Sequence, residues 1–82
     1  MGPSQEKRIR EMKPGDKVKV VRIDDYTKEV CETLNAPTHI GMVGTIEEIR
    51  YNKNMSRTEV IVNHNGEHYI WEPWNLMLVA VQ

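Results

Sequence analysis

One cysteine and three histidines are the side chains of this 82-residue chain best suited to nucleophilic or metal chemistry. They are Cys31, His39, His64 and His68. Structural zinc sites draw on closely spaced ligand pairs such as Cys-x-x-Cys, and the chain has no such pair. In the hairpin predicted below, strand alternation also places His64 and His68 on opposite faces, where they cannot share an ion. We therefore expect no bound metal and no cofactor.

Two arrangements could nominally support catalysis, namely Cys31 with a histidine and the adjacent carboxylates Glu47 and Glu48. Successive side chains of a strand point to opposite faces, so Glu47 and Glu48 would point apart. A chain of this length buries only about 60–65% of the surface exposed when it is unfolded. That is enough for one core but not for a deep, shielded reaction pocket beside it. We expect no enzymatic activity.

Composition indicates a single folded domain, because 39% of the residues are hydrophobic and 28% are charged. No apolar run approaches the roughly 18 residues that cross a bilayer, and the N-terminal residues lack the apolar stretch of a secretory signal. A lone cysteine excludes an internal disulfide and favours a cytoplasmic location. The composition leaves the oligomeric state open.

The domain is expected to cover residues 13–82, beginning at the Pro14-Gly15 turn signal. Residues 1–12 would form an N-terminal tail or a short helix capped by Ser4. Some of these residues can come from an expression vector. Alternating valines predict a first strand over residues 17–23, with a bulge or bend where the alternation changes phase at Val20-Val21.

Residues 24–40 form the longest stretch without a strand pattern. Tyr26, Val30 and Leu34 recur at helical spacing, Asp24 or Asp25 can cap the start, and Asn35 can end the helix. The stretch therefore predicts a helical turn inside a long excursion. Long loops in compact domains are often functional, so this excursion is a candidate binding element.

Two glycines precede the next predicted strand, over residues 41–49. Gly41 and Gly44 would supply a positive φ or a close backbone approach at a sheet corner. Ile46 and Ile49 are out of simple alternation, which places a bulge at Glu47-Glu48.

A hairpin around Asn65-Gly66 is the best-defined element, because this dipeptide favours a two-residue type I′ turn. Counting outward from the turn pairs residues 58–64 with residues 67–72. The inward face then carries Val60, Val62, Tyr69 and Trp71. The other face carries Ile61 and Ile70, flanked by the polar residues Glu59, Glu72, Asn63 and His68, and is expected to be mostly wet. Pro73 ends the hairpin, with a 3₁₀ turn near residue 74 and a last strand over residues 76–81.

This order of elements resembles that of small SH3-like barrels of about five strands, with a long first loop and a 3₁₀ turn before the last strand. The resemblance is carried by Lys13–Val20, Gly41–Ile49 and Trp71–Leu76 and covers most of the chain. The chain is similar in this plan to electron-transport accessory barrels and Mind-bomb-type repeats. In length it is most similar to small prophage-encoded SH3-like proteins. The resemblance implies an accessory subunit of a larger complex or a small phage-type regulatory protein.

Amphipathic aromatic residues indicate where a partner protein would bind, since the chain has two Trp, three Tyr and no Phe. Tyr26 in the excursion and Trp74 in the 3₁₀ turn, with Met42 beside them, form the candidate partner surface. The alternative is that these side chains serve packing alone.

Nucleic acid is the rival partner. Basic side chains on the first strand and the second connection could contact phosphates; they are Lys17, Lys19, Arg50, Lys53 and Arg57. The isoelectric point of about 6.3 argues against a dedicated nucleic-acid binder.

Overall fold

The computed structural model describes residues 12–79, so the expected helix over residues 4–11 and the end of the expected last strand lie outside the described residues. The fold is mostly β, as predicted. Its elements are β1 (Lys17–Val20), α2 (Asp25–Leu34), β2 (Val43–Asn52), β3 (Arg57–His64), β4 (Glu67–Trp71), the 3₁₀ turn η1 (Pro73–Asn75) and β5 (Leu76–Leu78).

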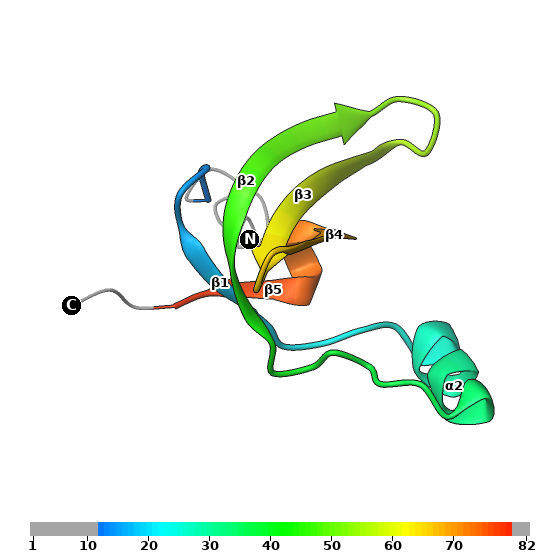
Figure 1. Ribbon diagram of the computed structural model, residues 1–82. Coiled ribbons are helices and arrows are strands. Elements are labelled where there is room, and N and C mark those ends of the chain that lie inside the picture. The colour runs from blue at the N-terminus through cyan, green and yellow to red at the C-terminus, as the bar shows by residue number, and fades with distance from the viewer. Residues whose placement is uncertain (1–11, 80–82) are drawn as a thin grey trace, which may run out of the picture.

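The five strands form one antiparallel sheet in the order β4-β3-β2-β1-β5. Strands β2 and β3 curve together over the other strands (Figure 1). Strands β4 and β5 are the two edges, so within residues 12–79 the sheet curls around its core but is not closed into a barrel by hydrogen bonds.

The core lies on the concave face of the sheet. Strict alternation in β1 buries Val18 and Val20 and exposes Lys17 and Lys19. Fully buried side chains from every strand except β4 meet there, and Trp71 of β4 packs against them. The core residues are Met12, Val18, Val20, Ile46, Val60, Val62 and Leu76. Met12, which the sequence places in the tail, is therefore part of the folded domain.

The β3–β4 hairpin has the predicted register, with Val60 opposite Trp71 and Val62 opposite Tyr69. Asn65 and Gly66 have φ values of 55° and 91°, as a type I′ turn requires at both central positions. Val60 and Val62 are fully buried, and Tyr69 and Trp71 are half-buried over them.

Strand β2 confirms both predictions for its glycines. Gly41 has a φ of 97°, and the Cα of Gly44 lies so close to β3 that an added Cβ would be 2.5 Å from the Asn63 carbonyl oxygen. The pairing of β2 with β3 shifts register between Ile46 and Glu48. This irregularity lets both Ile46 and Ile49 face the core although they are three residues apart.

Two boundaries differ from the sequence prediction. Strand β1 ends at Val20 rather than at residue 23, because the Val21 and Arg22 amides donate to the Asn75 carbonyl of η1 instead of to a neighbouring strand. Strands β2 and β3 extend into the connection expected between residues 49 and 58. They leave a turn of four residues, 53–56, between them. Asn52 Oδ1 accepts the Met55 amide in this turn.

Helix α2 forms within the predicted excursion and stands away from the sheet (Figure 1). Asp24 precedes it in an extended conformation and Asn35 ends it with a left-handed φ of 56°. None of its residues is buried. In the part of the chain that is described, no helix is long and apolar enough to cross a membrane.

Candidate protein-binding cleft

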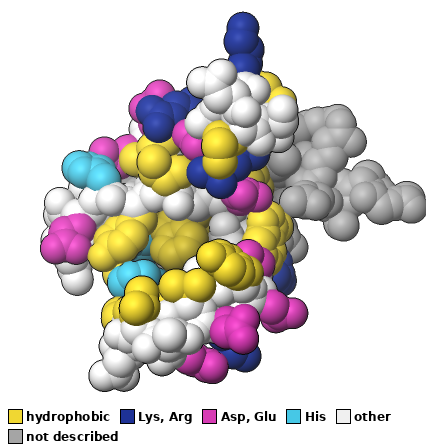
Figure 2. Space-filling view, turned by 90° about the vertical axis from the view of Figure 1, so that its right-hand side faces the viewer, with side chains coloured by type: hydrophobic (Ala, Val, Ile, Leu, Met, Phe, Trp, Pro, Cys, Tyr) yellow, Lys and Arg dark blue, Asp and Glu magenta, His cyan; other side chains and the backbone are white. Residues whose placement is uncertain are grey.

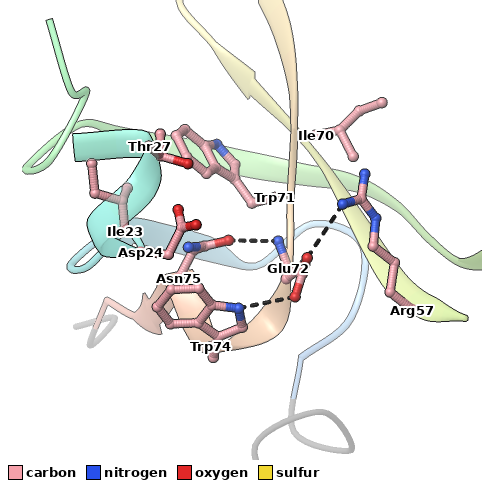
Figure 3. A pocket seen from close by; sticks show the side chains of 9 residues that line it. All are labelled: Ile23, Asp24, Thr27, Arg57, Ile70, Trp71, Glu72, Trp74 and Asn75. Atoms are coloured by element: carbon pink, nitrogen blue, oxygen red, sulfur yellow. Dashed lines mark hydrogen bonds and ion pairs between the residues drawn. The ribbon is translucent and has the colours of Figure 1, made fainter. Parts of the chain in front are cut away.

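An open cleft of about 370 Å³ lies between the beginning of α2 and the end of the β3–β4 hairpin (Figure 3). The excursion supplies one wall and η1 supplies another, while β3 and β4 close the third side. The lining residues are Ile23, Asp24, Thr27, Arg57, Ile70, Trp71, Glu72, Trp74 and Asn75.

The η1 wall is held by a capping box, in which the Glu72 amide donates to Asn75 Oδ1 at 2.8 Å. Trp74 Nε1 donates to Glu72 Oε1 at 2.9 Å, which fixes the indole against the turn. Asn75 Nδ2 donates to the Arg22 carbonyl at 2.9 Å and Arg22 donates back to the Trp74 carbonyl. The two walls are therefore tied together at their base.

Trp71 is oriented by a buried histidine. Its Nε1 donates to His64 Nε2 at 3.2 Å, and His64 Nδ1 lies 3.0 Å from the Val43 carbonyl oxygen. One tautomer satisfies both contacts, with the proton on Nδ1 and a free acceptor on Nε2. His64, which is 2% exposed, thereby connects β2, β3 and β4 and fixes the Trp71 ring.

Tyr69 and His39 extend the aromatic surface beyond Trp71. The Tyr69 and Trp71 rings are nearly parallel with centroids 6.2 Å apart, and His39 lies 5.0 Å from Tyr69. In Figure 2 hydrophobic side chains gather in a hollow on this face, with histidine side chains beside them. The Tyr69 hydroxyl donates to Glu67 Oε1, and this hydrogen bond to a carboxylate raises the pKa of Tyr69.

The charges at the β3 side of the cleft are paired. Arg57 bridges Glu72 and Glu59, with nitrogen–oxygen distances of 3.3 Å to each. Glu59 is only 3% exposed, which corrects its predicted place on the wet face. The Arg50, Asn52 and Arg57 side chains cover it and supply hydrogen bonds to both carboxylate oxygens.

The structure does not bring the three predicted partner-binding residues together. Trp74 lines the cleft, half-buried, as the accessible aromatic residue of η1. Tyr26 is 74% exposed on α2 and is not among the lining residues, and Met42 is half-buried against the core with its sulfur 3.0 Å from His39 Nδ1.

The sequence did not assign Asp24, Trp71 and Glu72 to a site. Trp71 was expected in the core, and it does pack there with one part of its ring system while another part lines the cleft. The three-residue spacing of Trp71 and Trp74 across Pro73 is the one sequence signal that could have indicated a shared surface. No local pattern links either indole to Asp24, which is about fifty positions away in the chain.

The basic residues that were proposed to contact nucleic acid also do not form one group. Arg50 and Arg57 are engaged with Glu59, whereas Lys17 and Lys19 are exposed on β1 and Lys53 is exposed in the β2–β3 turn. Lys17, Lys19 and Lys53 form no salt bridge within residues 12–79.

His39 and His64 both contact the Tyr69 and Trp71 rings, whereas Cys31 and His68 lie in separate environments. Cys31 Sγ lies 3.6 Å from the Pro37 carbonyl oxygen, His64 is buried on the inner face, and His68 contacts Glu47 at 2.9 Å on the outer face. Asn63 donates to Glu47 as well, and this hydrogen bond, with His68 beside it, lowers the pKa of Glu47. Across residues 12–79, no three His, Cys, Asp or Glu side chains cluster as metal ligands would.

Comparison of the chain with models of protein families, with curated proteins and with solved structures gives no match.

Proposed function

We propose that the chain is a non-enzymatic, cytoplasmic protein-binding or assembly module of the SH3-like kind, which docks on its partner through the cleft between α2 and η1. Its role would be that of an accessory subunit of a larger complex or of a small phage-type regulatory protein. The observation that carries the proposal is the open cleft lined by two half-buried indoles, Trp71 at the end of β4 and Trp74 in η1.

The order of the elements supports the SH3-like assignment. The long excursion joins β1 to β2, the tight hairpin joins β3 to β4, and η1 precedes β5, which pairs with β1. These are the features on which the resemblance in the sequence depends. A loop excursion and a 3₁₀ turn at one end of such a sheet leave a groove that a second polypeptide can enter.

The chemistry of the cleft supports a polypeptide partner. Tryptophan is enriched among residues that dominate binding energy, because it buries a large area at a small cost in side-chain entropy. Polar groups that can orient a ligand, namely Asp24, Thr27 and Glu72, lie at the same cleft. The volume is large enough for a few side chains and too open for shielded chemistry.

A partner that depends on this cleft should be lost when Trp74 is replaced by Ala. Tagged wild-type and W74A chains would be used for capture from extracts of the native host, followed by quantification of each recovered protein. Y51A is the matched control, since Tyr51 is 61% exposed on β2 outside the cleft. We expect W74A to retain the wild-type circular dichroism spectrum, and recovery to fall at least tenfold for W74A but not for Y51A.

Nucleic-acid binding remains the second candidate, supported by Lys17 and Lys19, which lie exposed on one strand. Labelled single- and double-stranded oligonucleotides titrated across salt concentrations would reveal it. Micromolar, strongly salt-dependent binding that is lost when Lys17→Glu is combined with Lys19→Glu would contradict the protein-binding proposal.

A further inference from the structure

We infer that the Asp24 end of the cleft binds an arginine side chain of the partner protein, with the guanidinium against the indole surface of the cleft and paired with the Asp24 carboxylate. The inference rests on the proposed protein-binding function and specifies the chemistry that the partner must present.

The two indoles form the first part of this subsite. In Figure 3 the Asp24 carboxyl group lies near the Trp71 ring, the Asn75 side chain stands between it and Trp74, and all four side chains line one cleft. Each indole nitrogen already has an internal partner, His64 Nε2 for Trp71 and Glu72 Oε1 for Trp74. The edges that carry the N–H groups are therefore engaged inside the protein, and what each ring can offer a ligand is its apolar, electron-rich surface. Such surfaces attract cations.

Asp24 supplies the charge. It stands at the start of α2, yet its side chain forms no capping hydrogen bond with the helix. No salt bridge or side-chain hydrogen bond engages it anywhere in residues 12–79. Its carboxylate is exposed at the cleft and is free to accept hydrogen bonds from a ligand.

The opposite end of the cleft shows why the free charge is confined to Asp24. There Glu72 accepts hydrogen bonds from both Trp74 and Arg57, and Arg57 also contacts Glu59. These groups neutralise one another, so neither Glu72 nor Arg57 offers an unpaired charge to a ligand. The remaining uncompensated charge in the lining is negative, and it complements a positively charged side chain.

Arginine fits this arrangement better than lysine. A guanidinium is planar, stacks on aromatic surfaces and donates two parallel hydrogen bonds to one carboxylate. A lysine ammonium is compact and strongly hydrated, and it would gain less from a flat aromatic surface. The open end of the cleft leaves room for the main chain that would carry the arginine.

The test uses N-acetyl-arginine N-methylamide as the probe and follows the two indole Nε1–H signals of the full chain by NMR. Citrulline in the same blocked form is the neutral control, because it keeps the shape of arginine and removes its charge. We expect both indole signals to move with the arginine probe and to move little with citrulline.

Asp24→Asn should lower the affinity for the arginine probe by about threefold to fivefold, which is the range for an exposed ion pair. Asn is as good as Asp at the start of a helix, so this variant should fold. Asp25→Asn is the matched control, because it removes the same charge one residue away, outside the cleft. It should leave the affinity unchanged.

Three results would overturn the inference: equal shifts with the arginine and citrulline probes, equal shifts with the arginine probe and N-acetyl-lysine N-methylamide, or equal losses of affinity in D24N and D25N. None of these concerns the capture experiment with W74A. If recovery of a partner falls in W74A but not in D24N, the proposed function stands. That result would contradict the arginine subsite alone.

Discussion

Glu59 and His64 are buried polar residues whose hydrogen bonds join β3 to neighbouring strands. Every buried side-chain nitrogen and oxygen in residues 12–79 has a hydrogen-bond partner. Glu59 accepts from Asn52 Nδ2 and Arg50 Nε, each at 3.0 Å, and from Arg57. These hydrogen bonds, with that from Asn52 first, lower the pKa of Glu59 below its ordinary value.

A lowered pKa in the folded state makes stability depend on pH. The unfolded chain takes up the proton first as the pH falls below about 4.3, the ordinary value for Glu. The stabilisation from Glu59 is thus complete above that pH and is lost as the pH falls through the folded pKa. We expect Glu59→Gln to be less stable than wild type near neutral pH, and the difference to shrink in acid.

Urea unfolding between pH 7 and pH 3 measures this difference. Glu48→Gln is a suitable control, because Glu48 is exposed on β2 and forms no salt bridge within residues 12–79. A constant gap between wild type and E59Q over the whole range would show that Glu59 stabilises the fold through packing and not through its charge.

The burial of Glu59 could not be predicted from the sequence, for a physical reason. Strand alternation correctly put His64 on the face opposite to His68, but it put Glu59 on the wet face. Burial of Glu59 depends on Arg50 and Asn52 arriving from β2 and on how far the paired strands extend beyond the predicted turn. Such pairings are set by tertiary structure, and no local pattern encodes them.

At the scale of elements, glycine controls how closely β2 approaches β3. Besides the Asn63 carbonyl, a Cβ on Gly44 would meet Val62 Cγ1 at 2.6 Å and His64 Nδ1 at 2.8 Å. The closest of these atoms, the Asn63 carbonyl oxygen, belongs to the backbone of a paired strand. It therefore cannot move aside without disturbing the strand pairing. The Gly41-x-x-Gly44 spacing predicted this close approach because only two physical roles, positive φ or proximity, commonly demand glycine before a strand.

Gly44→Ala should therefore destabilise the fold by about 1–3 kcal/mol, the usual cost of overpacking. Thr45→Ala is the neighbouring control, since Thr45 is exposed, and it should change the free energy of unfolding by about 0.5 kcal/mol or less. Chemical denaturation measures both. A stable G44A variant would mean that β2 and β3 can separate without loss, contrary to the packing described here.

The register of the β3–β4 hairpin was predicted completely, because a two-residue turn leaves no freedom in counting. A helical turn in the excursion was also predicted, from Tyr26, Val30 and Leu34, and the structure has a longer element there, the ten-residue helix α2. Of the parts that line the cleft, the sequence singled out Trp74 and the excursion over residues 24–40, which supplies Asp24 and Thr27. The other walls of the cleft come from segments whose spatial neighbours are fixed by the curl of the whole sheet, which alternation alone does not specify.

At the scale of the whole molecule, the chain divides into a curled sheet that buries its core and an excursion that buries nothing. All core residues belong to the strands or to Met12, while α2 contributes none. Exposed apolar side chains on and after α2, including Tyr26, Leu34 and Ile40, are retained without a packing role in residues 12–79. An element that adds no core is expected to serve binding, because stability gives no reason to keep it.

This division predicts that the sheet folds without the helix. Replacing residues 25–34 by a short Gly-Ser linker removes only exposed and half-buried side chains, and lengthening or shortening a flexible connection changes closure entropy little. We expect the free energy of unfolding to change by about 1 kcal/mol or less, whereas Ile46→Ala, a core control, should cost about 2–5 kcal/mol. Urea denaturation followed by tryptophan fluorescence would measure both changes, and the arginine probe would bind the shortened chain more weakly because the wall that holds Thr27 is gone. A shortened chain that fails to fold would instead make α2 part of the structural unit, and the excursion would lose its standing as an element kept for binding.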